Sequence, residues 1–81
     1  MRMRLKRVKR SDKIAYYYFP EGSKIPGLVE VDTNTGEVNL VRISSHEKKN
    51  GFNNFVSKAR GAVKKMLDDG ELLDEKYFAW G

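Results

Sequence analysis

The sequence predicts an α+β fold: an antiparallel meander sheet of four strands, or three, packed on one C-terminal amphipathic helix, in the order ββββα plus a docked aromatic tail. Three observations support this prediction. Short strand-like stretches separated by turn residues fill the first half of the chain. The apolar spacing changes to a helical period from Phe52. With 81 residues and no cysteine, the chain has room for one core, so residues 1–81 are expected to form a single domain.

Residues 1–20 are expected to form a first hairpin. Its first strand alternates apolar residues with cations, the period of a half-buried strand with one basic face: Met1, Arg2, Met3, Arg4, Leu5 and Lys6. The alternation slips at Arg7 and Val8, which indicates either a bulge or a pattern that fades before the turn. Ser11 and Asp12 supply turn chemistry. An aromatic-rich strand over 13–19 follows and ends at Pro20.

A second hairpin is expected over 28–43, after a loop at 20–27 that is rich in glycine and proline. Its strands are predicted at 28–32 and 38–43, on either side of Thr33-Asn34-Thr35-Gly36. Gly36 can take the left-handed backbone conformation that a hairpin loop of this length requires. This turn is the clearest local signal in the chain.

A helix is predicted from about 51 to 69, because apolar residues fall on one stripe: Phe52, Phe55, Val56, Ala59, Val63, Met66 and Leu67. Asn50 is a candidate N-cap, and Gly70 is a candidate stop just after the last turn. The tail over 71–81 contains too many apolar and aromatic residues for a free end. We therefore expect it to dock on the domain.

Charge is distributed unevenly along the chain. The net charge is +5, yet the first 13 residues alone carry +6, with seven cations against Asp12. An opposite bias near the end comes from Asp68, Asp69, Glu71, Asp74 and Glu75. This acidic segment can pair with the basic first strand, within one molecule or between two, and so shield it from a ligand. A carboxylate cluster for metal or acid-base chemistry is the alternative, but no second constellation stands at a matching spacing.

The sequence argues against catalysis. It offers no nucleophile with its base, no metal-ligand spacing around its single histidine, His46, and no glycine-rich phosphate loop. We therefore predict no catalytic residue, no metal, no cofactor and no small-molecule substrate. The basic start is not followed by an apolar run long enough for a signal peptide, and no stretch is apolar enough to span a membrane, so we expect neither. Without cysteine, the expected location is the cytoplasm.

The second strand suggests a candidate binding surface. Ile14, Tyr16 and Tyr18 should point to one face of the sheet, and Ala15, Tyr17 and Phe19 to the other. A single helix covers only one face, so some rings should meet water or a partner, beside the basic first strand. Aromatic rings beside cations suit nucleic acid, DNA or RNA, because cations contact phosphates and rings stack on bases. The candidate residues are Arg2, Arg4, Lys6, Lys9, Arg10, Tyr16, Tyr17 and Tyr18.

Two alternatives remain for this surface. In one, the rings fill the core and the cations keep an edge strand from aggregating. In the other, the open sheet face or an edge strand recruits a protein partner or a second copy of the chain, as in an inhibitor or accessory subunit. The sequence leaves open the sheet order and which face the helix covers, so it does not decide between these readings.

Two secondary features combine polar residues with a helix. On the predicted helix, Gly61 lies opposite the apolar stripe, where a glycine costs about 1 kcal/mol of helix stability relative to alanine. Two readings of this basic side of the helix remain: the glycine admits the close approach of a partner, or the side is simply solvated. The cations of this face are Lys58, Arg60, Lys64 and Lys65. Ser44 and Glu47 stand at capping-box spacing before Lys48 and Lys49, which indicates either an anion site at the helix start or a solvated loop.

Two short motifs, Pro26-Gly27-Leu28-Val29 and Thr35-Gly36-Glu37, are followed by one helix and a terminal segment ending in Trp80. In these features the chain resembles small uncharacterised bacterial proteins of about this length, a likeness that implies no function. The order of strands then helix is also similar to the amino-terminal arm-binding domains of tyrosine-type integrases, whose three-stranded sheet reads the DNA major groove. Lys9-Arg10-Ser11-Asp12-Lys13 and Tyr16-Tyr17-Tyr18 carry that likeness without a diagnostic motif, so it is an analogy.

Overall fold

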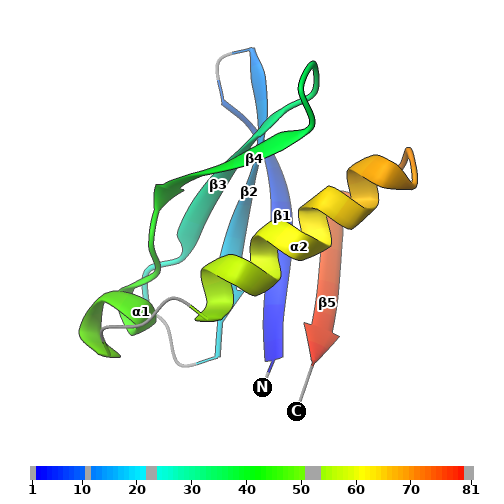
Figure 1. Cartoon of the computed structure of the whole chain (residues 1–81). Helices are drawn as coiled ribbons and strands as arrows, with labels where there is room; N and C mark the ends of the chain where they lie inside the picture. The colour runs from blue at the N-terminus through cyan, green and yellow to red at the C-terminus, as the bar shows by residue number, and fades with distance from the viewer. Residues whose placement is uncertain (1, 11, 22–23, 51–53, 80–81) are drawn as a thin grey trace.

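The computed structural model describes residues 2–10, 12–21, 24–50 and 54–79, with the side chains of residues 46, 50, 54 and 78 left aside. Predictions that concern Met1, Ser11, Phe52, Trp80, or the side chains of His46 and Asn50, lie outside this description. Within it the elements are β1 (Arg2–Arg10), β2 (Lys13–Pro20), β3 (Gly27–Asp32), β4 (Glu37–Arg42), α1 (Ser45–Asn50), α2 (Asn54–Asp68) and β5 (Glu75–Ala79). The predicted α+β class is confirmed (Figure 1).

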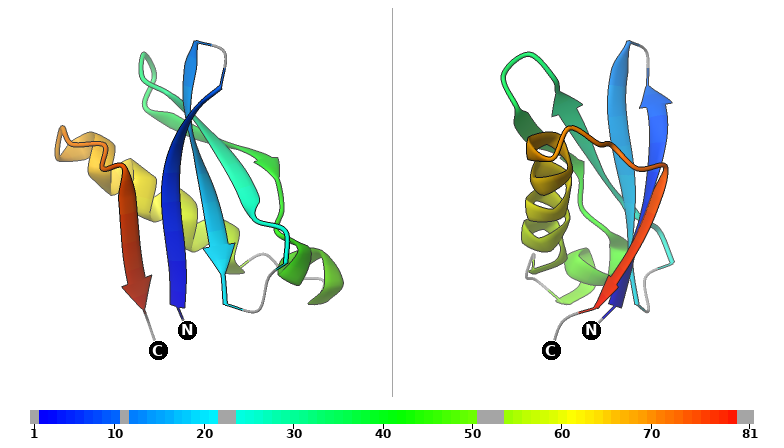
Figure 2. Two further views of the ribbon diagram at one scale, coloured as in Figure 1. Left: turned by 180° about the vertical axis from the view of Figure 1, so that it is seen from behind. Right: turned by 90° about the vertical axis from the view of Figure 1, so that its right-hand side faces the viewer.

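The sheet has five antiparallel strands in the order β4-β3-β2-β1-β5. The first four form the predicted meander. The fifth is the tail, which docks as a strand along β1, with Arg2 opposite Ala79 and Lys6 opposite Glu75. Docking as a strand satisfies backbone groups of β1 that would otherwise lie at an unpaired sheet edge. The aromatic tail therefore widens the sheet instead of covering one of its faces (Figure 2).

Both hairpins follow the pattern of the sequence. The register of β1 with β2 runs unbroken from Met3 opposite Pro20 to Arg10 opposite Lys13, so the slip at Arg7 is no bulge. The second hairpin turns at Gly36, whose φ of 78° lies in the left-handed region and whose N–H donates to the Asp32 carbonyl at 2.8 Å. A register shift lies in the pairing of β3 with β4, at Leu28 and Val29.

Helix α2 lies across one face of the sheet (Figure 2). Of the described residues of the predicted stripe, five are buried against the sheet and Leu67 is partly buried. The core consists of Met3, Leu5, Tyr16, Tyr18, Val29, Val31, Val38, Phe55, Val56, Ala59, Val63 and Met66. The helix ends with two bonds typical of a left-handed glycine stop, from the Gly70 N–H to the Leu67 carbonyl and from the Glu71 N–H to the Met66 carbonyl. The opposite face of the sheet carries no helix among the described residues.

The segment between β4 and α2 differs from both readings of the sequence, since it forms the short helix α1. Ser44 and Glu47 make the capping box, with the Glu47 N–H donating to Ser44 Oγ at 3.3 Å. The Glu47 side chain is buried and reaches further, because its Oε2 accepts the Val56 N–H in the first turn of α2 at 2.9 Å. At the start of the main helix, where one of the two readings placed a bound anion, the Glu47 carboxylate of the protein itself accepts the hydrogen bond.

Candidate functional site

Strand β2 divides its aromatic side chains between the two faces of the sheet. Tyr16 and Tyr18 belong to the core beneath α2. Tyr17 and Phe19, which alternate with them, point to the face that no described helix covers, hereafter the open face (Figure 2). Both are half-buried, so part of each ring is accessible.

Tyr18 is a structural residue in this arrangement. Its side chain is fully buried, and its hydroxyl donates to Glu47 Oε1 at 2.7 Å while accepting the Ser44 N–H at 3.2 Å. Burial, and then the bond to the Glu47 carboxylate, raise the pKa of Tyr18 above its ordinary value. The neutral phenol is the form that donates to Glu47, so Tyr18 joins β2 to both helices and is not available to stack on a base.

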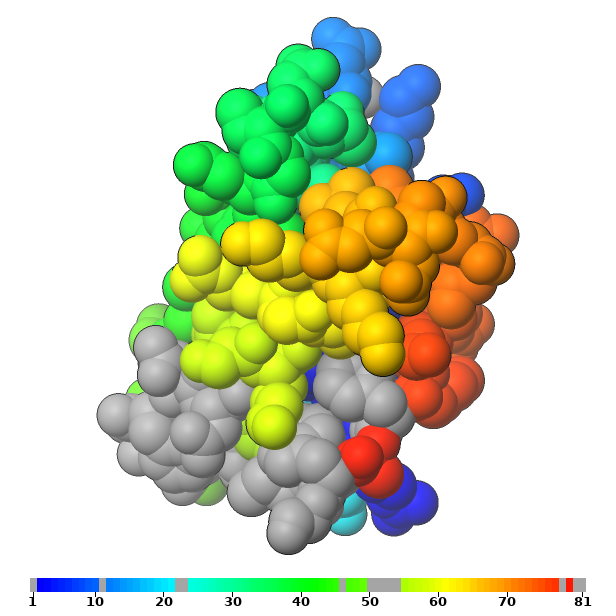
Figure 3. All heavy atoms as spheres, turned by 45° about the vertical axis from the view of Figure 1, so that its right-hand side comes forward, coloured from blue at the N-terminus to red at the C-terminus, as the bar shows by residue number. Residues whose placement is uncertain are grey.

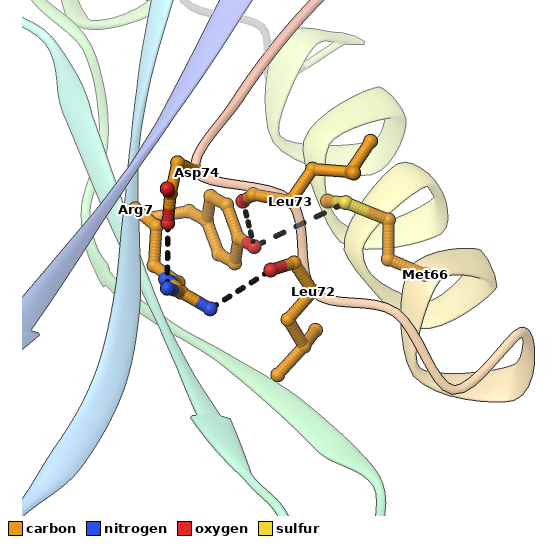
Figure 4. A network of polar contacts seen from close by, with 6 residues as sticks. Arg7, Met66, Leu72, Leu73 and Asp74 are labelled. Atoms are coloured by element: carbon orange, nitrogen blue, oxygen red, sulfur yellow. Dashed lines mark hydrogen bonds and ion pairs between the residues drawn. The ribbon is translucent and has the colours of Figure 1, made fainter.

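Tyr16 has the same structural character and holds the tail. Its hydroxyl donates to the Leu73 carbonyl at 2.6 Å, with the Met66 sulfur 4.0 Å away (Figure 4). Burial is the largest cause that raises the pKa of Tyr16. Two of the three tyrosines predicted to contact nucleic acid are therefore core residues, because the helix covers their face of the strand.

The open face instead carries a row of side chains that crosses three strands. Arg4 of β1 lies between Phe19 of β2 and Tyr77 of β5, its partner residues on either side. The guanidinium carbon of Arg4 sits 4.4 Å from the centre of the Phe19 ring, a cation–π contact. The Tyr17 and Phe19 rings are 6.2 Å apart and tilted by 52°. Tyr77 is 68% exposed, although aromatic side chains usually bury most of their surface.

Sequence reasoning missed Tyr77 as a site residue. The tail was expected to dock, but its strand register and therefore the side to which Tyr77 points were not deduced. The alternation of side chains along a strand would have placed the Tyr77 side chain on the face of the sheet opposite to that of Lys76. In the structure Tyr77 borders a shallow, open hollow at one end of the open face, together with Arg2, Arg4, Phe19 and Glu21.

The predicted cations do not all share this face. Four of them alternate with the buried residues of β1 and therefore lie on the open face: Arg2, Arg4, Lys6 and Arg10. Lys9 lies on the other face of the strand, the one that carries the core residues. Several of them pair with carboxylates: Arg2 with Glu21 at 3.6 Å, Arg4 with Glu75 at 3.8 Å, and Arg10 with Glu30 at 3.0 Å. These pairs are at least partly exposed and individually weak. Lys6 makes no ion pair among the described residues.

Arg7 explains why the alternation of β1 slips. It lies on the helix side of the sheet, where its guanidinium donates to the Leu72 carbonyl at 2.8 Å and pairs with Asp74 (Figure 4). Its backbone N–H also donates to the Asp74 carbonyl. The acidic tail thus pairs with the basic strand within one molecule, as one of the readings of the sequence expected. It does so mainly at the edge of the sheet, without covering the open face.

The basic helix face is a separate surface on the other side of the molecule. Lys58, Arg60, Lys64 and Lys65 are all exposed on α2, which stands at the front of the space-filling view (Figure 3). The sheet and its core separate this surface from the open face (Figure 2). The two predicted sets of cations therefore do not form one site.

The structure adds little in favour of other chemistry. Within the described ranges, no three His, Cys, Asp or Glu side chains gather closely enough to hold a metal ion. None of the helices in the described part of the chain is both long and apolar enough to cross a membrane. Comparison with protein-family models, with curated protein sequences and with solved structures finds no match.

Proposed function

We propose that this protein is a non-enzymatic module that binds single-stranded nucleic acid on the open face of its sheet. One observation carries the proposal: Tyr17, Phe19 and Tyr77 lie beside Arg4 and Lys6 on a face that no described helix covers. Cations that contact phosphates and rings that stack on bases are the two components of single-strand recognition. A cytoplasmic location fits a chain without cysteine.

A single strand suits this surface better than a duplex. Stacking on a side chain requires a base whose face is free, and the bases of a duplex are already stacked on one another. The open face is a broad sheet with a shallow hollow (Figure 2), whereas a duplex major groove admits a narrow element, an α-helix or a two-stranded β-ribbon. A base can stack on Tyr77, or on the guanidinium plane of Arg4 that already lies over Phe19.

The carboxylates on this face modulate binding without preventing it. Glu21 and Glu75 neutralise part of the charge of Arg2 and Arg4 in the free protein. Because these pairs are exposed, exchanging a carboxylate for a phosphate costs less than about 1 kcal/mol for each pair. Lys6 lies two residues after Arg4 on the same face of β1, opposite Tyr17 of β2, and it has no such pair to break among the described residues.

Fluorescence anisotropy with labelled single-stranded oligonucleotides of mixed sequence tests the proposal. Three phosphate contacts, to Arg2, Arg4 and Lys6, predict a slope of about −2 when the logarithm of the association constant is plotted against that of salt concentration. Tyr77→Ala should weaken binding by about 1–3 kcal/mol, whereas Tyr77→Phe keeps the ring and should bind nearly as well. Failure to detect binding to DNA or RNA at about 50 mM salt would remove the proposal.

A second candidate function, protein recruitment, is favoured by the edge of β4. Leu40 and Val41 of this strand are 41% and 40% exposed, and β4 pairs on one side only among the described strands. An antiparallel pair of two β4 strands would place Glu37 of one copy opposite Arg42 of the other, so a second copy is one partner that fits. Light scattering should then show a dimer that Val41→Lys disrupts, because a lysine on an edge strand opposes strand pairing. A monomer at all concentrations removes the self-pairing form.

A further inference from the structure

Gly61 lies at the outermost position of α2 and has no role in the fold. It is exposed, and a Cβ added to it would meet nothing within 4 Å. It lies in the middle of the 15-residue helix, far from either cap, and no positive φ is found there. Glycine is a poor helix former, and alanine at this position would contact no other part of the described chain. The internal structure therefore gives no reason for glycine here.

The surroundings of Gly61 are basic. In a helix, residues three and four positions apart are neighbours on the surface, so Lys58, Lys64 and Lys65 surround Gly61, and Arg60 extends the same face. All four side chains are exposed. Arg60, Lys64 and Lys65 make no ion pair with any described residue, whereas most cations of the open face have a carboxylate partner. Asp68 marks the C-terminal limit of this basic face.

We propose that this face of α2 is a second nucleic-acid surface, which contacts backbone phosphates and leaves room for one of them over Gly61. Arg60, Lys64 and Lys65, which have no ion pair among the described residues, complement a polyanion, and a glycine allows the phosphate backbone to approach the helix backbone closely. The face carries no aromatic side chain, so it has nothing to stack on a base. It therefore binds duplex and single strand alike, through phosphates and without sequence preference.

The position of this surface has a structural consequence. The open face and the outer face of α2 lie on opposite sides of the molecule, separated by the sheet and the core (Figure 2). One chain can then hold two nucleic-acid segments at once, a single strand on the sheet and a second segment on the helix. The second surface does not depend on the first, because the two share no residue.

Gly61→Ala separates a binding role from a structural role. If Gly61 serves binding alone, the substitution should raise the melting temperature, whereas a structural role predicts a lower one. The substitution should raise the melting temperature by about 4–8 °C, the shift expected of a more stable helix in a domain of this size. It should also weaken binding of the full chain to a short mixed-sequence DNA duplex severalfold, since the added methyl group occupies the space over the helix. A higher melting temperature with unchanged duplex affinity would overturn the proposal, and so would a lower melting temperature.

The lysines provide a matched pair of charge changes. Lys64→Gln should reduce the salt dependence of duplex binding by about 0.9, the value for one lost phosphate contact. Lys9→Gln removes the same charge from an exposed lysine at the far end of β1 and should leave that slope unchanged. Equal effects of the two variants would show that binding follows net charge alone, and would contradict a defined surface on α2.

Parallel measurements distinguish this surface from the open face. Tyr77→Ala should leave duplex affinity unchanged, and a duplex affinity that depends on Tyr77 would overturn the proposal of a separate surface. Duplex binding together with single-strand binding that does not depend on Tyr77 would support the helix surface while contradicting the function proposed for the sheet. Vesicles of phosphatidylserine and phosphatidylcholine provide the alternative anion, and binding to them but not to the duplex would also overturn the assignment.

Discussion

Tyr17 and Tyr18 are neighbours in the chain but lie in opposite environments. The Tyr18 ring is fully buried under α2, and its hydroxyl exchanges hydrogen bonds with Glu47 and Ser44. Tyr17 is half-buried on the open face, where its ring centre is 6.2 Å from that of Phe19. The difference follows from strand geometry, since successive side chains point to opposite faces of a sheet. One face of the sheet is thus committed to the fold, and the other is available to a ligand.

The largest expected difference between the faces is in stability. Tyr18→Ala should lower the free energy of unfolding by about 3–5 kcal/mol, because it leaves a cavity in the core and removes a partner of the buried Glu47. Tyr77→Ala on the open face should change it by less than about 0.5 kcal/mol. Urea unfolding followed by circular dichroism measures both values. Similar losses in the two variants would contradict the division between a structural face and an available face.

Gly27 provides a second test of the packed face. The Tyr18 ring lies directly over Gly27, and a Cβ there would stand only 1.9 Å from the ring carbon Cζ. Because that ring is buried and hydrogen-bonded it cannot move cheaply, so Gly27→Ala should cost about 1–3 kcal/mol of stability. In a Tyr18→Leu background the same substitution should cost much less. A cost that is the same in both backgrounds would show that the ring is not the obstacle.

The buried phenols also predict how stability depends on pH. The pKa values of Tyr16 and Tyr18 are raised in the folded protein, chiefly by burial. A group whose pKa is raised by folding stabilises the native state while it is protonated, so this contribution is present below pH 10.0, the ordinary tyrosine value, and is lost above it. The urea midpoint should therefore fall as the pH rises above about 10. Tyr18→Phe should make that fall shallower, and an equal fall would exclude Tyr18 as a source.

The smallest expected effect concerns the strand that completes the open face. Asp74→Asn removes the ion pair with Arg7, which is largely exposed, and should cost less than about 1 kcal/mol. Its effect should be local, with faster hydrogen exchange of the amides that join β1 and β5 and little change in β2 and β3. Faster exchange throughout the sheet would mean that the tail is part of the global folding unit.

Much of the fold follows from local patterns in the sequence. The alternation over 13–19 assigns the two faces of β2, the turn ending at Gly36 defines the second hairpin, and the apolar stripe with Gly70 defines the main helix. These signals are local, because they depend on side-chain periodicity and on backbone conformations that particular residues prefer. The same alternation predicts aromatic rings on a face of the sheet that a single helix cannot cover. In the structure, Tyr17 and Phe19 lie on that open face.

The remaining features depend on residues far apart in the chain. Arg7 is one example, because its partners Leu72 and Asp74 are more than 60 residues away along the chain. The residues around Arg7 give no sign of these partners, so the sequence shows only an interruption of the alternation in the first strand. The strand register of the tail depends on β1, and with it the exposure of Tyr77. Glu47 was recognised as a capping residue, but its burial depends on Tyr18 and Val56, which lie 29 and 9 residues away.

The central claim is that one face of the sheet binds and the other holds the fold together. Titration of the labelled protein with a single-stranded oligonucleotide, followed by nuclear magnetic resonance, tests it most directly. We expect chemical-shift changes to centre on Arg4, Tyr17, Phe19 and Tyr77, with much smaller ones at the buried ring of Tyr18. Changes centred on the edge of β4, or no changes under low-salt conditions, would contradict the account.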